Sequence, residues 1–196
     1  MKKNSKLKKG FTLIEFLTVT VVISSIGLVI VGILTSSLRG NNKTNIVNLV
    51  RINGNGAIVQ MTKTIKYAKS FDGVSLNGDP NSYTTNCVQN PVPTPTPTLA
   101  PIKYSYVKIT AFDQGQVIFS CTSDNKIASN GALLIDANAV SVVPGKCWFT
   151  CTQERATSYP IIGISFQLMQ SATNVFAENT ASVPFETSVS FRNLVK

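Results

Sequence analysis

The chain has 196 residues, of which 43% are hydrophobic and 14% charged, and its formal net charge is +9. This composition excludes an intrinsically disordered protein, and the length allows one globular core with appendages. The positive charge is concentrated in residues 1–70, which hold eleven Lys or Arg against one acid, Glu15, whereas residues 71–196 sum to −1. The basicity therefore belongs to the N-terminal part, and a nucleic-acid-binding face on a folded domain is not expected.

Residues 16–34 form a run without a charged side chain. As a helix rising about 1.5 Å per residue it would span about 28 Å, close to the ~30 Å hydrocarbon thickness of a bilayer. Five lysines precede it within the first nine residues, and such a basic flank stays in the cytoplasm. The sequence thus predicts a single-pass membrane helix with the rest of the chain outside. A secretory signal peptide is the alternative, but its apolar region is shorter, about 7–15 residues, and no small-x-small cleavage site follows this run.

The residues at the start of the run, KKGFTLIE at positions 8–15, resemble the processing site of type IV prepilins and of the related pseudopilins of type II secretion. The resemblance implies that a prepilin peptidase cuts after Gly10 and methylates the new N-terminus, Phe11. It also implies that Glu15, at the fifth mature position, serves filament assembly. Gly10 suits a cleavage site because its backbone, without a Cβ, can lie close to the catalytic groups of a protease.

The resemblance implies an α+β, type IV pilin-like fold in which a long N-terminal helix packs on an antiparallel β-sheet meander. The expected parts are a cleaved basic leader (1–10), the helix (11–71, with 11–35 in the membrane and later in the filament core), a proline-rich loop (72–102) and a C-terminal β-rich domain (103–196).

Beyond the membrane run, apolar residues recur at intervals close to 3.6 residues from Ile46 to Phe71, which predicts a continuing helix with one buried face. Glycine weakens a helix by about 1 kcal/mol relative to alanine. Because Gly40, Gly54 and Gly56 fall in this helix, a bend or frayed stretch is expected between Gly40 and Gly56.

Five prolines within residues 91–101 predict an extended, exposed loop, and the Thr-Pro alternation there also resembles O-glycosylated stalks. From residue 102 onward, short runs of β-branched and aromatic residues alternate with turn-forming residues, which predicts strands. The runs are 104–111, 116–121, 126–129, 132–135, 140–143, 147–151, 161–169 and 185–191. After one long helix they predict a meander packed on the helix's second half.

Four cysteines, Cys87, Cys121, Cys147 and Cys151, all lie on the outward side of the membrane helix, where an even count predicts disulfides. Residues four apart in a strand are about 13 Å from each other, beyond the ~7 Å limit for a bridge, so Cys147 and Cys151 can pair only if the chain turns back. The preferred scheme is Cys87–Cys121 with Cys147–Cys151, because the first bridge would staple the proline-rich loop to the sheet. Other pairings, a four-thiolate metal site and a redox-active Cys147–Cys151 pair are the alternatives.

Because the chain has no histidine, Ser-His-Asp triads and histidine-based zinc sites are excluded, and the glycine motifs that bind phosphate are not present. We expect no enzyme activity, no catalytic residue, no metal and no cofactor.

The resemblance implies a structural subunit, a pilin or minor pilin, of a type IV pilus-like surface filament. Its implied partners are the prepilin peptidase, the inner-membrane assembly platform, other pilin subunits and, before assembly, the lipid bilayer; nucleic acid is not expected. The chain would start as a precursor in the cytoplasmic membrane, with its N-terminus inside, and end in an extracellular filament on the bacterial surface. A type II secretion pseudopilin and a filament-borne adhesin or DNA-uptake module are the alternatives, the last on the basic segment 39–69.

Overall fold

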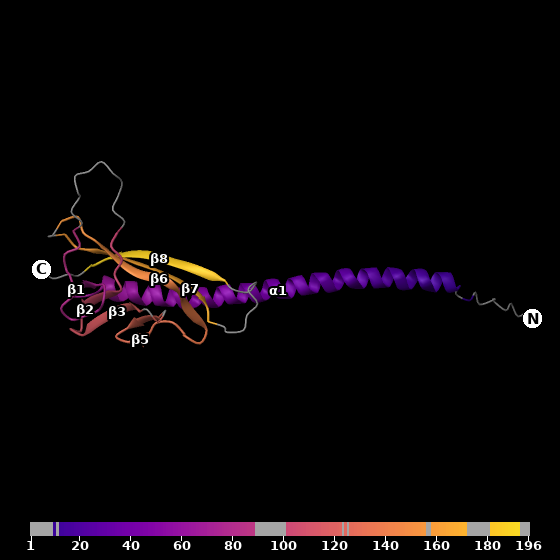
Figure 1. The fold of residues 1–196 in the computed structure, drawn as a ribbon, viewed down its shortest axis with the longest axis horizontal. Helices are drawn as coiled ribbons and strands as arrows, with labels where there is room; N and C mark the ends of the chain where they lie inside the picture. Colours follow the sequence, from indigo (N-terminus) through magenta and orange to yellow (C-terminus); the bar gives the residue numbers. More distant parts are fainter. Residues whose placement is uncertain are drawn as a thin grey trace, which may run out of the picture. The chain divides into compact units, whose positions relative to one another are not determined.

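The computed structural model describes residues 10, 12–88, 101–122, 124, 126–155, 158–171 and 181–192. These residues form one helix, α1 (Leu13–Lys66), and eight strands (Figure 1). The strands are β1 (Ser70–Ser75), β2 (Tyr106–Thr110), β3 (Gln116–Thr122), β4 (Lys126–Ser129), β5 (Ala132–Leu133), β6 (Val140–Thr152), β7 (Ile161–Gln170) and β8 (Ser182–Ser190). The chain divides into two compact units, residues 1–42 and residues 43–196. The predicted α+β class, one long N-terminal helix with antiparallel sheets, is confirmed.

Helix α1 begins after Thr12, which caps it. The carbonyl of Thr12 accepts the N–H of Phe16 at 3.2 Å, and its hydroxyl accepts the N–H of Glu15 at 3.4 Å. These two bonds are the usual arrangement at a helix N-terminus, since the first-turn N–H groups have no partner within the helix.

The helix continues to Lys66 without interruption, so the fraying expected between Gly40 and Gly56 is wrong. Within the second unit, one face of α1 is buried through Val50, Gly54, Ala57, Met61 and Ile65. Tertiary packing of such a face outweighs the helix-weakening effect of a few glycines. The helix ends before Phe71, the end predicted from periodicity, because Phe71 already belongs to strand β1.

The first sheet joins its strands in the order β1-β2-β3-β4-β5, each antiparallel to the next. Strand β1 takes in the last two residues of the predicted helix 11–71 and the first four of the predicted loop 72–102, so the predicted boundary between them is wrong. Its pairing with β2 shifts between Phe71 and Gly73, and Gly73 has a φ of 124°. This β-bulge breaks the alternation by which a strand is recognised. The proline-rich tract 91–101 lies outside the described residues except for Pro101.

The second sheet has the order β6-β7-β8, so the single meander expected from the sequence is two sheets. The two runs predicted at 140–143 and 147–151 are one strand, β6, whose pairing with β7 is irregular between Val142 and Cys147. Gly145, with a φ of 67°, lies in that irregularity. The strand therefore continues through a segment that reads as a turn in the sequence.

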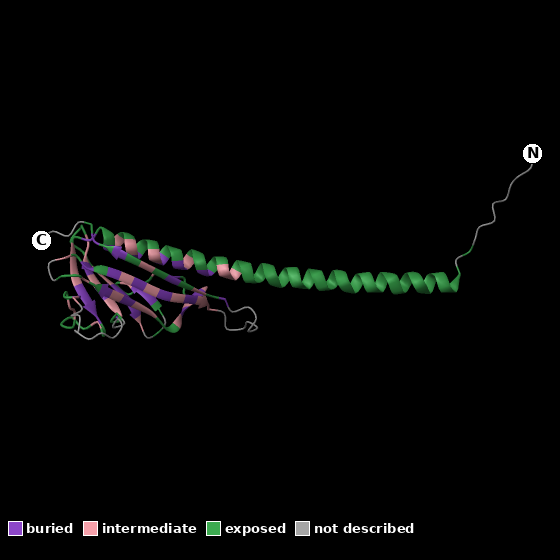
Figure 2. Cartoon of the chain, turned by 90° about the horizontal axis from the view of Figure 1, so that it is seen from above, coloured by how far each residue is buried: buried purple, intermediate pink, exposed green. Residues whose placement is uncertain are grey.

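The core of the second unit lies between the buried face of α1 and the inner faces of the two sheets. Burial alternates along the strands and, on α1, is confined to the part in this unit (Figure 2). At Gly54, α1 lies close against β8, because a Cβ built there would overlap the ring of Phe185. That ring stacks on Phe166 with centroids 5.2 Å apart. Glycine at position 54 therefore allows the helix to lie directly on an aromatic layer.

The disulfides join Cys87 to Cys151 and Cys121 to Cys147, with a Cα–Cα distance of 5.5 Å in each. The preferred scheme, Cys87–Cys121 with Cys147–Cys151, is therefore wrong. Cys147 and Cys151 both lie in the extended strand β6, so the chain does not turn back between them. Cys121 lies in β3, so its bridge links the two sheets, and the other bridge ties the segment after β1 to β6.

Non-reducing peptide mapping of the oxidised protein is expected to recover the 87–151 and 121–147 linked peptides. Both pairs of Cα atoms already lie within bridging distance, so no rearrangement is needed. A chain with Cys87 and Cys151 both replaced by serine is the control, and it should keep the 121–147 link alone. Recovery of a 147–151 peptide from the native protein would contradict this connectivity.

Candidate functional site

The predicted processing site precedes α1. Gly10 is exposed, and a Cβ built on it would have nothing within 4 Å. Phe11, the residue expected to be methylated, lies outside the described residues. Glu15 is exposed in the first turn of α1, two residues after the helix begins. Open space at Gly10 is compatible with access by a protease, and the cut itself stays a prediction.

The part of α1 in the first unit is apolar on all sides and uncovered. All residues from 12 to 42 are exposed, and an 18-residue window of the helix has a mean hydropathy of 2.6. Apolar surface contributes about 25 cal/mol per Å² when removed from water, so a surface of this extent requires a cover. The helix is long and apolar enough to cross a membrane, a property that membrane anchors and signal sequences share.

Most hydroxyl groups within this apolar segment are satisfied by the helix itself. Five of them donate to a carbonyl three or four residues earlier, at 2.8–2.9 Å: Thr18, Thr20, Ser24, Ser25 and Thr35. Such bonds lower the cost of placing a hydroxyl in lipid or in a dry protein interior. Between residues 12 and 38 the one charged side chain is Glu15. Its carboxylate is therefore the group that needs a partner when this segment leaves water.

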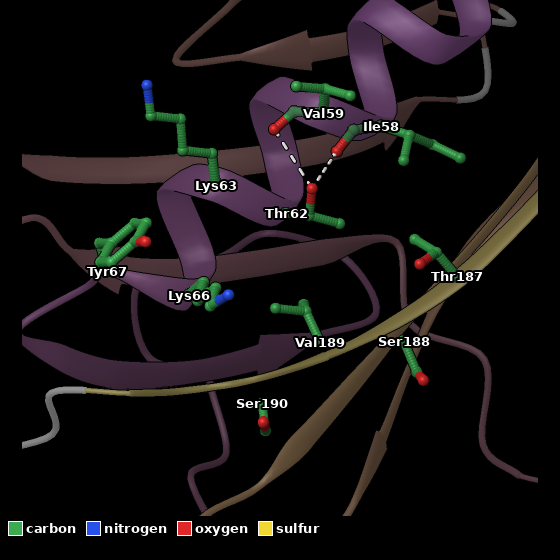
Figure 3. Close-up of a pocket in the computed structure, with 10 residues that line it drawn as sticks. All are labelled: Ile58, Val59, Thr62, Lys63, Lys66, Tyr67, Thr187, Ser188, Val189 and Ser190. Atoms are coloured by element: carbon green, nitrogen blue, oxygen red, sulfur yellow. Dashed lines mark hydrogen bonds between the residues drawn. The ribbon is translucent and has the colours of Figure 1, made fainter.

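A groove of about 580 Å³ lies between α1 and β8 in the second unit (Figure 3). The helix contributes Val59 and Lys63 to its lining, among others, Tyr67 follows the end of the helix, and β8 contributes residues 187–190. The Thr62 hydroxyl lies in the groove but donates to the Ile58 carbonyl at 2.7 Å. The groove thus presents apolar side chains and lysines at an open surface, and its lining does not include a buried polar group aimed at a ligand.

Two tyrosines have perturbed acidity, and both lie in the second unit, outside the candidate membrane segment. Burial, and to a smaller extent the neighbouring Tyr106, raises the pKa of Tyr83, and burial raises the pKa of Tyr104. The Tyr83 hydroxyl is buried without a hydrogen-bond partner among the described residues. A raised phenol pKa keeps both groups neutral at physiological pH, so neither is suited to act as a base.

Within the described ranges, no three His, Cys, Asp or Glu side chains gather closely enough to hold a metal ion. All four cysteines are bridged, so the alternatives of a four-thiolate site and of a Cys147–Cys151 redox pair are wrong for this structure. Comparisons with protein-family models, with curated proteins and with solved structures find no match. The residues and their geometry are therefore the basis for inferring the function.

Proposed function

We propose that this chain is a prepilin-like structural subunit that is processed after Gly10 and assembled through α1 into a type IV pilus-like surface filament. The observation that carries the proposal is the uncovered apolar part of α1, fully exposed from residue 12 to residue 42, whose first residues belong to the KKGFTLIE motif. A chain that kept only a membrane anchor would not need a processing motif on the cytoplasmic side of that anchor.

In this proposal the apolar surface of α1 is covered first by lipid and later by other subunits. Lipid covers the helix while the chain is a membrane precursor with its basic leader in the cytoplasm. Neighbouring helices of the same kind cover it after assembly. Cleavage after Gly10 removes the five leader lysines and leaves the apolar segment as the new N-terminus, which a signal peptidase acting beyond the segment would discard. The partners of the proposal are the prepilin peptidase, the assembly platform and other pilin subunits.

The second unit supports a pilin-like architecture. In it, the second half of α1 packs on antiparallel sheets through one face and shares its core with them. One disulfide joins the two sheets, and the other joins β6 to the segment after β1. Both are suited to an oxidising, extracellular environment. The same structure would serve a pseudopilin, which differs in the machine that assembles it.

Intact-mass and N-terminal peptide analysis of the mature protein tests the processing step. We expect a chain that lacks residues 1–10 and begins with N-methyl-Phe11. A Gly10→Val variant is the control, because a branched side chain beside the cut bond should block the peptidase and retain the leader. A mature chain that starts downstream of residue 34 would show that the apolar segment is a signal peptide and would refute the family assignment.

A further inference from the structure

The outer face of the β6-β7-β8 sheet carries an ordered set of polar side chains that the filament proposal does not use. Strand register places Thr150, Gly163 and Ser188 in one row across the three strands. The adjacent outer row is Trp148, Ser165 and Glu186. The intervening row, which includes Phe149 and Ile164, faces the core and is buried. Alternation along the strands therefore gathers hydroxyls, a carboxylate and an indole on one exposed face.

A hollow of about 290 Å³ lies at this position. Its lining includes Trp148, Thr150, Ser165, Glu186 and Ser188, with Gly163 between them. A Cβ built on Gly163 would overlap the Thr150 hydroxyl. The backbone at Gly163 has no left-handed conformation that would require glycine. The missing side chain thus leaves room for the Thr150 hydroxyl to lie over β7 at the floor of the hollow.

The indole that borders the hollow is in contact with a lysine side chain. Tyr104 and Phe149 exchange backbone hydrogen bonds of 2.8 Å, which brings the segment before β2 alongside β6. From this segment Lys103 places its Nζ 3.9 Å from the centroid of the Trp148 ring. A cation–π contact of this kind restricts the ring, so less conformational freedom is lost when a ligand binds.

The position of the hollow limits what can bind there. Strand β7 is the central strand, paired on both sides, so its backbone is not available to a peptide that adds as a strand. A nucleic acid would need a cationic groove, whereas the charged side chain in this lining is Glu186, an acid. The ligand must therefore be recognised by side chains and carry no large negative charge. The volume of about 290 Å³ lies just below the range for ligand sites, about 300–1,000 Å³, which suits a ligand no larger than one small ring.

We propose that this hollow binds one pyranose ring of a neutral glycan. The Trp148 ring would contact the apolar C–H face of the sugar. The Glu186 carboxylate would accept hydrogen bonds from ring hydroxyls, and the Thr150, Ser165 and Ser188 hydroxyls can donate or accept others. All of these groups lie in the second unit, so the site stands whether or not the chain enters a filament.

Tryptophan fluorescence reports on this site directly, because Trp148 is the single tryptophan of the chain. The full-length protein would be kept in a detergent without a sugar headgroup and titrated with the methyl glycosides of glucose, galactose, mannose and N-acetylglucosamine. We expect a saturable change in emission with at least one of them. Glu186→Gln should weaken that binding by about tenfold, since a hydrogen bond to a charged group is worth roughly that factor.

Two further variants make the result decisive. Gly163→Val fills the hollow, and the Thr150 hydroxyl must rotate away from the new Cβ. We expect the response to disappear while the 121–147 disulfide and the circular dichroism spectrum stay unchanged. Glu154→Gln removes an exposed carboxylate elsewhere on the chain and should bind as the native protein does. The proposal is refuted if none of the four glycosides produces a saturable change, or if Glu186→Gln and Gly163→Val respond as the native protein does.

Discussion

Replacing Glu15 with leucine is expected to prevent entry of the chain into filaments while leaving membrane insertion, cleavage and folding unchanged. Glu15 is the single charge among residues 12–38, and a lone ionised group in a membrane helix costs on the order of a few kcal/mol. After cleavage the Phe11 amine lies four residues before it and can carry a positive charge. In a dry filament core, Glu15 of one subunit can pair with the amine of a neighbour and so fix the axial register.

Loss of the carboxylate would leave that amine buried and unpaired. Removing one partner of a buried pair costs about 3–5 kcal/mol, which corresponds to a reduction in assembly of at least about 100-fold. The measurement compares the amount of the Glu15→Leu chain in the membrane fraction with its amount in sheared filaments. Thr18→Leu, which removes a hydroxyl already bonded to the Glu15 carbonyl within the helix, is a matched control and should assemble normally. Equal incorporation of both variants would show that the carboxylate is merely tolerated.

Replacing Gly54 with leucine is expected to lower the free energy of unfolding of the second unit by about 3 kcal/mol or more, a large effect for overpacking. The Phe185 ring occupies the place where even a Cβ would lie, and this ring is itself packed on Phe166. The larger side chain must therefore push α1 away from β8 or displace the aromatic pair. The loss would be measured by chemical unfolding of the full-length chain in detergent.

Gly56→Leu is the matched control for this prediction. Gly56 lies two residues further along the same helix, is exposed and has nothing within 4 Å of a built Cβ. There the substitution should stabilise the helix by roughly 0.5–1 kcal/mol, because leucine is a better helix former than glycine. The double variant Gly54→Leu/Phe185→Ala should recover part of the lost stability, since it exchanges volume across one contact. A Gly54→Leu chain as stable as Gly56→Leu would contradict the close packing of α1 on β8.

The parts of the fold that the sequence predicted well are those whose signals are local. The apolar run and its periodic continuation predicted α1, and the segment 126–129 matches β4 at both ends because turn residues flank it. The parts that it missed depend on pairing between distant segments. The bulge at Gly73 interrupts the alternating pattern of β1, so this strand was not predicted. Pro144-Gly145 is typical of a turn, yet β6 continues through it.

The disulfides show why spacing alone was insufficient. The spacing of Cys147 and Cys151 implies that they can pair only if the chain turns back between them. The structure shows that it does not, because both residues lie in the extended strand β6. Which partner each cysteine then meets depends on how β3 and the segment after β1 lie against β6, and no local pattern encodes that arrangement. The hollow could not be predicted from the sequence for the same reason. Trp148 and Gly163 come from separate strands, and strand register brings them near each other.

The most direct test of filament assembly is the N-terminal peptide of this chain in sheared, purified surface filaments. We expect the chain to be present in that fraction with an N-methylated peptide beginning at Phe11, directly after Gly10. Finding this peptide in the filament fraction would show that the same chain is both processed and assembled. A chain found solely in the membrane fraction, or a filament-associated form that still carries residues 1–10, would contradict the proposal.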